Sequence, residues 1–453
     1  MLKRKAYDRL VQWKQASNGS TALLVEGARR VGKSTLVSTF GTHEYRSYMV
    51  IDFFLATDEV KDYFLEMRND LDSLFLYLST YYGVELYERE SLIVFDEVQA
   101  FPQARGLIKY LVEDGRYDYI ETGSLLSIKQ NIRGILIPSG EETFELNPLD
   151  FEEFLWAMGE RQLADLIRSC FEKSRPLPNN LHSRAMRLFR EYMLTGGMPK
   201  PVDVYVQQRK FAPVDREKRQ ILSLYRNDVA RFAHGYEFKV TSVFDGIAGQ
   251  LSKHEKKFTL ASLDKSARMR SYEEAFFWLA DARIADICYA SNDPSVGLGL
   301  SQDQTALKCY MADTGLLVSM AFSDTSETDD GVYRAILRGD IGLNEGMFTE
   351  NIVAQMLRAN GHRLFFYSQS GKKDGEERME IDFLIVRPYA DAAMKPRISP
   401  LEVKSPRQYG TTSLDRFKEL FKKRVGTQYV LHTKQMSVEG SRIYLPLYMG
   451  FCL

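Results

Sequence analysis

The chain has 453 residues, of which 44% are hydrophobic, and its 60 Lys and Arg residues nearly balance 61 Asp and Glu residues. The length suggests two to four domains, and the apolar content is enough for packed cores, which excludes a disordered protein. The balanced charge excludes a basic surface over the whole molecule and leaves local basic faces open.

Cysteine usage and hydropathy indicate a cellular compartment. Cys170, Cys288, Cys309 and Cys452 are scattered without a CxxC pair, so neither a disulfide framework nor structural zinc is expected. Residues 1–15 are charged and helix-like, with no apolar stretch after them that would make a signal peptide. No apolar run approaches the length of a membrane span. We therefore expect a cytoplasmic protein without a membrane partner.

Residues 21–150 alternate between strand-like and helix-like patterns. Strands are expected over residues 21–27, 46–54, 91–97, 117–124 and 142–149, and helices over 33–40, 60–83 and 104–114. Strands that alternate with helices pair in parallel, because each helix carries the chain back to the start of the next strand. The pattern predicts an α/β domain over residues 1–150 with a mainly parallel sheet covered by helices.

After Pro148 the sequence becomes helix-rich. Residues 151–225 are expected to form a helical lid or linker region, and the turn cluster TGGMPKPV (195–202) is interpreted as a hinge. Residues 214–290 also have helical patterns, and the order of three helices and a strand over 226–325 is typical of a winged helix.

Three basic side chains precede a predicted helix in this winged-helix-like segment. Lys265, Arg268 and Arg270 are suitable contacts for the phosphates of DNA. The alternative is an ordinary solvated helix face in a winged helix that contacts only protein.

The segment GARRVGKST lies between a predicted strand and a predicted helix and matches the GxxxxGK[ST] pattern. Its residues are Gly27, Ala28, Arg29, Arg30, Val31, Gly32, Lys33, Ser34 and Thr35. Glycines allow backbone N–H groups to surround phosphate oxygens, and the helix N-terminus adds a favourable dipole. We expect Lys33 to reach the β- and γ-phosphates of ATP and Ser34 to ligate Mg²⁺. The alternative is a glycine turn before a structural helix.

Two acids end the buried strand pattern LIVFDEVQ. Asp96 and Glu97 would be costly at the end of such a strand without a cation or water. We expect Asp96 to hold Mg²⁺ through water and Glu97 to polarise the attacking water as the catalytic base. The alternative is a pair of acids that caps a helix.

The fourth strand ends in ETGS, where Thr122 or Ser124 could position the attacking water or sense the γ-phosphate. A simple exit from strand to turn explains these residues equally well. An arginine usually offsets charge on the transferring phosphate. Arg133 is the first candidate for this catalytic role, followed by Arg29 and Arg30, although a neighbouring subunit could also supply it.

These motifs, together with ELNPLDFEEFL (145–155) and TGGMPKPV, resemble the AAA-like P-loop ATPases of prokaryotes that carry a C-terminal DUF4143 region. The resemblance covers nearly the whole chain. It implies an AAA-like ATPase core, a helical and winged-helix-like middle, and a C-terminal α/β domain similar to restriction endonucleases over residues 335–453. It also implies adenine rather than guanine, which agrees with the absence of an NKxD motif, and it makes a ring-like oligomer possible.

The C-terminal segment contains acids in a strand pattern. EIDFLIV puts Glu380 and Asp382 on one strand face, and LEVKS puts Glu402 and Lys404 on one face of the next strand. The preceding helix pattern carries Glu350. Carboxylate oxygens suit Mg²⁺, which activates water, and a lysine stabilises a phosphorane-like transition state.

This order resembles the PD-(D/E)xK nuclease superfamily. The resemblance makes Asp382 and Glu402 metal ligands, Lys404 the catalytic lysine and Glu350 the helix acid. An insertion over 387–398 departs from a compact member of the superfamily. The alternative is a nuclease-like scaffold used for binding, with Glu402 and Lys404 paired at a surface.

The leading hypothesis is a DNA-associated ATPase that couples Mg-ATP turnover to domain movement and carries a nuclease-like module. The second is an ATP-dependent switch that binds protein partners and has an inactive nuclease-like scaffold. A third is ATP binding without turnover. The sequence leaves the partner and the oligomeric state open.

Overall fold

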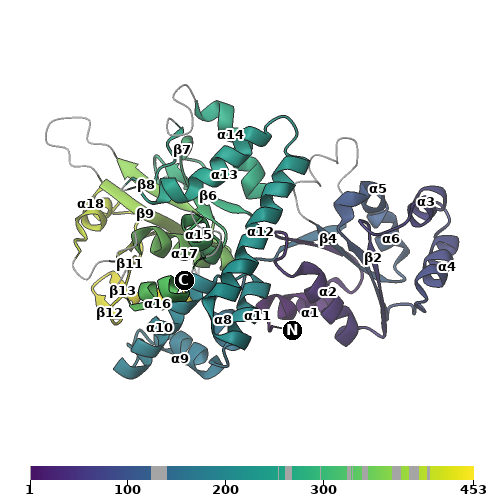
Figure 1. Cartoon of the computed structure of the whole chain (residues 1–453), viewed down its shortest axis with the longest axis horizontal. Coiled ribbons are helices and arrows are strands. Elements are labelled where there is room, and N and C mark those ends of the chain that lie inside the picture. The colour runs from purple at the N-terminus through teal and green to yellow at the C-terminus, as the bar shows by residue number, and fades with distance from the viewer. Residues whose placement is uncertain are drawn as a thin grey trace. The chain divides into compact units, whose positions relative to one another are not determined.

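The computed structural model describes residues 2–123, 140–253, 255–260, 268–295, 297–323, 328, 330–338, 345–369, 379–386, 397–405 and 409–453. The chain divides into two compact units (Figure 1). Unit 1 contains residues 1–147 and 281–283, and unit 2 contains 148–280 and 284–453. No helix in the described ranges is long and apolar enough to span a membrane.

Unit 1 contains a five-stranded sheet in the order β2-β3-β4-β1-β5, and all its strand pairs are parallel. The strands are β1 (Ala22–Glu26), β2 (Ser47–Asp52), β3 (Ser91–Asp96), β4 (Asp118–Gly123) and β5 (Glu141–Glu145). Every residue of β1, β3 and β4 is buried, as expected for strands covered on both faces. The predicted parallel α/β arrangement is confirmed.

Helices cover both faces of this sheet (Figure 1). They are α1 (Lys5–Ser17), α2 (Lys33–Glu44), α3 (Asp58–Glu66), α4 (Leu71–Tyr82), α5 (Pro102–Arg105) and α6 (Ile108–Asp114), with a 3-10 turn η1 (Val98–Ala100) after β3. Phe53, Phe64 and Phe95 form the centre of the core under α3, with ring centroids 5.5–5.6 Å apart. This packing fixes the carboxyl end of β3, where the two predicted site acids lie.

The helices of unit 2 occur before, between and after its strands. They are α8 (Phe151–Ala157), α9 (Arg161–Glu172), α10 (Asn179–Thr195), α11 (Pro199–Gln208), α12 (Phe211–Phe232), α13 (Glu237–Leu251), α14 (Met269–Asp281), α15 (Thr314–Ala321), α16 (Asp330–Arg338), α17 (Glu345–Ala359) and α18 (Thr412–Leu420), with a 3-10 helix η3 (Leu447–Cys452).

An eight-stranded mixed sheet runs through unit 2 in the order β12-β13-β11-β10-β9-β8-β6-β7. Its strands are β6 (Ala285–Ser291), β7 (Gln302–Met311), β8 (Phe365–Gln369), β9 (Met379–Val386), β10 (Ile398–Val403), β11 (Gln428–His432), β12 (Ser437–Glu439) and β13 (Arg442–Pro446). Because β6 pairs with β8, segments expected in separate domains share one sheet.

This sheet changes the expected division of the chain. Residues 285–291 were expected to continue a helix, but they form β6, which pairs Tyr289 in parallel with Phe365. The boundaries expected at 225/226 and 325/335 therefore separate no compact units, and a separate winged-helix domain is not confirmed. A partner strand this far away in sequence overrides the local helical pattern.

The TGG turn was interpreted as a hinge, but the structure buries it within unit 2. The Gly197 N–H donates to Asp313 Oδ2 at 2.5 Å, and the Gly197 carbonyl accepts from the Leu149 N–H at 2.7 Å. A Cβ at position 197 would lie 2.1 Å from the Leu149 carbonyl oxygen, so only glycine fits there. The turn is a packed junction between three segments.

Candidate nucleotide site and a second acidic cluster

The predicted phosphate-binding loop connects β1 to α2 in unit 1. Its first glycine, Gly27, lies so close to the backbone of Leu146 that an added Cβ would be 2.5 Å from the carbonyl oxygen. Gly32 has a φ of 97°, which strongly favours glycine, and α2 begins at the next residue. The loop therefore requires glycine at both positions for backbone reasons, as a phosphate-binding loop does.

Lys33 is buried at the start of α2, with 5% of its surface exposed. Its ammonium group donates to the carbonyl oxygens of Gly27 at 3.0 Å and Ala28 at 3.2 Å. The lysine thus lies across the loop with its charge directed at the loop's interior. An ammonium group is a strong hydrogen-bond donor to phosphate oxygens.

Three predicted residues from three elements meet at Asp96, the last residue of β3. Asp96 is 6% exposed, and its Oδ1 accepts from the Ser34 hydroxyl of α2 at 3.0 Å. The Thr122 hydroxyl of β4 donates to the same oxygen. Because β4 lies between β3 and β1, the sheet order itself brings Thr122 to this position. Oxygen ligands of this kind suit Mg²⁺.

Glu97 follows directly in an unusual backbone conformation. Its φ of 52° is in the left-handed region, and its N–H donates to Thr122 Oγ1 at 3.2 Å. The Gln99 side-chain amide donates to the Glu97 carboxylate, a contact that sequence reasoning missed. A polar residue two positions beyond the acids in an otherwise apolar stretch was the available signal. Backbone strain of this kind is frequent at functional sites.

Some of the remaining residues predicted for the nucleotide site lie in the described part of the chain and others do not. Val31 is buried in the loop, whereas the side chains of Arg29, Arg30 and Thr35 are exposed. Arg133, the first candidate for the catalytic arginine, and Ser124 lie outside the described residues.

A second acidic cluster lies in unit 2, around the ammonium group of Lys308 on β7. Lys308 is 1% exposed, and its Nζ lies 3.1 Å from Glu350 Oε1, 2.9 Å from Glu380 Oε1 and 3.9 Å from Asp382 Oδ1. The Lys256 ammonium group also contacts Glu350. Sequence reasoning placed the acids but missed both lysines.

Burial and charge shift the pKa values in this cluster in opposite directions. Burial opposes ionisation of Glu350, but Lys308 and Lys256 hold its pKa down at about 2. Burial and the Glu350 charge raise the pKa of Asp382 to about 7. Burial also opposes the charge on Lys308, but the carboxylates raise its pKa overall. The lysine therefore stays charged and supplies the positive charge that a metal ion would bring.

Glu402 and Lys404 form a separate pair, with Lys404 Nζ 2.8 Å from Glu402 Oε2. Glu402 pairs in register with Val430, which belongs to the hydrophobic core that Leu414 and Phe417 of α18 complete. Paired residues share a sheet face, so Glu402 points to the α18 side. Burial raises its pKa, which Lys404 partly offsets.

The other face of the sheet carries the Lys308 cluster. Phe383 lies beside the ring of Tyr310 at 5.6 Å, and the Tyr310 hydroxyl donates to Glu350. Phe383 pairs with Leu401, so these residues share the Tyr310 side and the next residue, Glu402, points away from it. Asp382 and Glu402 therefore lie on opposite faces.

This arrangement corrects the expected grouping of Glu350, Asp382, Glu402 and Lys404 into one metal site. Strand β9 pairs Leu384 with Phe365 but Ile381 with Tyr367, so it contains one extra residue between the two pairs. Such a bulge turns Asp382 and Phe383 to the same face, which simple alternation cannot predict. Within the described residues, no group of three or more His, Cys, Asp or Glu residues is arranged to hold a metal.

Comparison with known protein families identifies three segments. Residues 19–155 match the AAA domain, 186–327 match a domain of unknown function (DUF8612), and 345–449 match a second domain of unknown function (DUF4143). No curated protein matches the chain.

Solved structures show only distant similarity. The Holliday junction branch migration motor RuvB of Thermotoga maritima has 12% identity and a TM-score of 0.31, over 65% of this chain and 90% of its own. The Aeropyrum pernix ORC1 protein in complex with DNA has 11% identity and a TM-score of 0.26, over 72% and 93%. The STAND protein PH0952 of Pyrococcus horikoshii has 11% identity and a TM-score of 0.28, over 79% and 45%.

These scores are too low to carry an argument about fold or function. The family matches and the geometry of unit 1 confirm the broader part of the expected resemblance: the chain combines an N-terminal AAA-type P-loop domain with a C-terminal DUF4143 region.

Proposed function

We propose that the chain binds and hydrolyses Mg-ATP at the carboxyl edge of the unit 1 sheet. The observation that carries this proposal is the convergence of Ser34 and Thr122 on Asp96, beside the phosphate-binding loop. Hydroxyl and carboxylate oxygens at the end of a parallel strand are the donor set expected for a magnesium-nucleotide site. The AAA domain match over the same residues agrees with it.

Each residue then has a distinct role. The loop N–H groups and Lys33 would bind the phosphates, and Ser34 and Asp96 would hold the magnesium ion. When bound, Mg²⁺ would supply positive charge that offsets the charge of the phosphates. The Glu97 carboxylate, next to Asp96 in the chain, would accept a proton from water, and Gln99 would fix its orientation. Thr122 links the two acids, because its hydroxyl donates to the Asp96 carboxylate and accepts from the Glu97 N–H.

Two variants separate binding from turnover. Lys33→Ala should weaken ATP binding and abolish phosphate release, because the loop loses its only buried cation. Glu97→Gln should bind ATP as the wild type does and release phosphate about 100-fold or more slowly, as loss of a general base predicts. Asp52→Asn is the matched control, because Asp52 ends the neighbouring strand β2 but bonds to Phe54 instead of Ser34. Unchanged phosphate release in Glu97→Gln would contradict hydrolysis and leave ATP binding without turnover.

We infer for unit 2 that the DUF4143 region binds a partner and does not cleave DNA. The supporting observation is that Lys308 already occupies the centre of the acids Glu350, Glu380 and Asp382. The chain would then be an ATP-dependent switch in which turnover changes the arrangement of the two units. The position of Lys308 therefore favours an ATP-dependent switch with an inactive nuclease-like scaffold over a nuclease.

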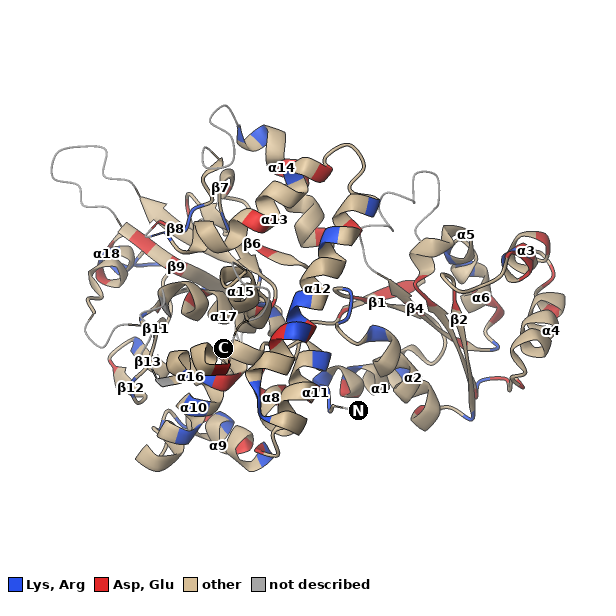
Figure 2. Cartoon of the chain, in the orientation of Figure 1, with Lys and Arg blue, Asp and Glu red and all other residues tan. Residues whose placement is uncertain are grey.

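Association with DNA is the alternative for the partner. Arg268 and Arg270 at the start of α14 are its candidates, whereas Lys265 lies outside the described residues. Figure 2 shows Lys and Arg residues interspersed with Asp and Glu along the described elements.

Incubation of plasmid and branched DNA with Mg²⁺ or Mn²⁺, with and without ATP, tests cleavage. We expect none, and cleavage lost in both Asp382→Asn and Lys404→Ala would restore the nuclease hypothesis. Salt-sensitive binding to DNA would identify DNA as the partner, and stimulation of ATP turnover by a protein would identify a protein.

A further inference from the structure

A pocket in unit 2 lies at the carboxyl ends of three mutually parallel strands. Ser405 follows β10, Thr433 follows β11 and Leu447 follows β13, and all three line the pocket. The cavity measures about 50 Å³ and opens to solvent, so a ligand can extend out of it. Small-molecule sites prefer this edge of a sheet. None of the residues proposed for ATP hydrolysis contributes to it.

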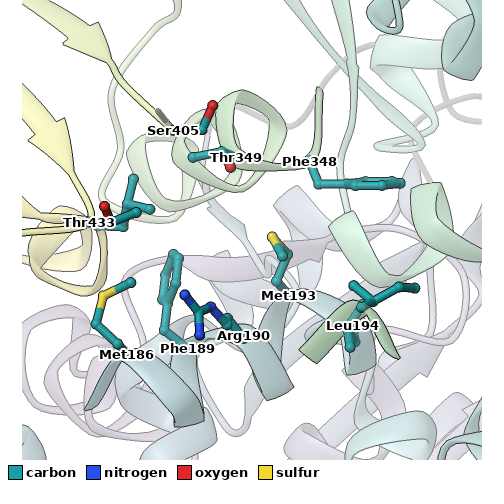
Figure 3. A pocket seen from close by; sticks show the side chains of 11 residues that line it. Met186, Phe189, Arg190, Met193, Leu194, Phe348, Thr349, Ser405 and Thr433 are labelled. Carbon is teal, nitrogen blue, oxygen red and sulfur yellow. The ribbon is translucent and has the colours of Figure 1, made fainter. Parts of the chain in front are cut away.

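Helix α10 supplies one wall of the pocket. Met186, Phe189, Arg190, Met193 and Leu194 line it, and their spacing of three or four residues puts them on one face of the helix. Figure 3 shows Phe189, Arg190 and Met193 on one side of the pocket, with Thr349 and Ser405 opposite. Methionine side chains adapt to ligands of different shape, so this wall suits an apolar body without rigid complementarity.

Helix α17 and the 3-10 helix η3 also contribute apolar side chains to the pocket. Phe348 of α17 is 1% exposed, and Leu447 of η3 is 4% exposed. These side chains are packed into the core, so the apolar lining is preformed. A ligand with an aliphatic or aromatic body would displace water from this lining favourably.

Arg190 is the only charged side chain that lines the pocket among the described residues. It forms no hydrogen bond or ion pair with any other described residue, although it lies on an otherwise paired helix. Arg184 lies 2.5 Å from Glu160, and Arg187 lies 4.0 Å from Glu191. Arg190 is exposed, so water solvates its guanidinium in the free protein, and a ligand anion in the pocket can reach this charge.

The other polar groups of the pocket are hydroxyls. Ser405 and Thr433 can each donate one hydrogen bond to an oxygen of the ligand. One guanidinium and a few hydroxyl groups match a singly charged carboxylate, which a guanidinium binds through two parallel hydrogen bonds. A phosphate dianion would call for more positive charge than the pocket contains.

We propose that this pocket binds a small amphiphilic carboxylate, with its apolar body against Met186, Phe189 and Met193 and its carboxylate at Arg190. The ligand is a free small molecule, because the pocket is partly enclosed. Octanoate is the probe, and octan-1-ol is its uncharged counterpart.

The test is a calorimetric titration of the full chain, with methyl NMR of ε-¹³C-methionine protein as a second readout. Octanoate should bind at least about tenfold more tightly than octan-1-ol and should shift the Met193 methyl signal, identified with Met193→Leu. Arg190→Gln should weaken octanoate binding about tenfold, which corresponds to the loss of one charged contact of about 1.4 kcal/mol.

Arg187→Gln is the matched control, since it removes an arginine one turn earlier on the same helix and should leave octanoate binding unchanged. Three results would overturn the proposal: no octanoate binding at millimolar concentration, equal binding of octan-1-ol, or equal binding by Arg190→Gln. Tight binding of an octapeptide that ends in leucine, without binding of octanoate, would overturn the assignment to a small molecule.

Discussion

The two units each gather carboxylates at a sheet, but they surround them with different partners. In unit 1, hydroxyls of Ser34 and Thr122 meet Asp96, and no Lys or Arg among the described residues lies within ion-pair distance of it. In unit 2, the ammonium group of Lys308 lies among three acids. The first arrangement leaves a charge for an added cation, whereas the second already contains one.

This difference teaches that acids alone do not define a metal site. The charge of a carboxylate in a protein interior must be offset, and a lysine or a metal ion can each do so. The neighbours of the acids decide between the two. For this chain they favour a metal-nucleotide site in unit 1 and a closed, structural cluster in unit 2.

The largest effect is expected from a substitution that breaks the acidic cluster around Lys308 in unit 2. Lys308→Met removes the central charge and leaves the buried Glu350 with the less buried Lys256 as its positively charged partner. Removing one partner from a buried charge cluster typically lowers the free energy of unfolding by about 3–5 kcal/mol. Denaturant unfolding measures it. Were a metal ion the natural partner of these acids, Lys308→Met would instead gain stability on addition of Mn²⁺.

The next effect compares the two sites through ATP turnover. Asp96→Asn should lower Mg²⁺-dependent phosphate release by about 100-fold or more, because it removes the acid that holds the ion. Asp382→Asn, the same change in unit 2, should leave the rate within about twofold. Equal losses in both variants would refute the distinction between the sites.

A smaller effect follows from the raised pKa of Asp382. The folded protein binds the proton of the Asp382 carboxyl group more tightly than the unfolded chain does. Protonated Asp382 therefore makes its full contribution to stability below about pH 4. The contribution is lost as the pH rises through about 7, the pKa of Asp382 in the fold. The difference in unfolding free energy between the wild type and Asp382→Asn, measured by thermal unfolding, should therefore change by about 2–3 kcal/mol between pH 5 and pH 8. A difference that does not change with pH would contradict the raised pKa.

The smallest effect concerns the pair that LEVKS forms. Lys404 is 25% exposed, whereas the side chain of Glu402 is 3% exposed, so only the lysine of this ion pair is solvated. Because burial already raises the pKa of Glu402, this acid can take up a proton when the lysine is lost, and Lys404→Ala should cost about 1–2 kcal/mol of unfolding free energy. A loss as large as that in Lys308→Met would give this pair a role comparable to the buried cluster.

The parts of the proposed nucleotide site could be located from the sequence because they are local. The glycine positions of the loop, Lys33 and the acids after β3 are each fixed by a contiguous strand-turn-helix or strand-turn pattern, and the parallel sheet follows from their alternation. Thr122 was reachable by the same reasoning, since it ends a buried strand. The orientation of Glu97 by Gln99 depends on a side-chain contact that no pattern states.

Unit 2 was harder to predict because its arrangement is non-local. The bulge in β9 changes which face Asp382 occupies, and only the pairing with β8 reveals it. Lys308 lies on β7, 42 residues before Glu350, so its position among the acids depends on the shared sheet. A lysine alternating with Tyr310 between apolar residues of LKCYM was the available sign of a buried cation.

Counting bound metal ions tests the central contrast most directly. Mn²⁺ can replace Mg²⁺ and be followed by electron paramagnetic resonance while a non-hydrolysable ATP analogue is present. We expect one Mn²⁺ per chain in the wild type and in Asp382→Asn, and loss of that ion in Asp96→Asn. A second ion in the wild type that disappears in Asp382→Asn would contradict a lysine-filled cluster and would make unit 2 a metal site.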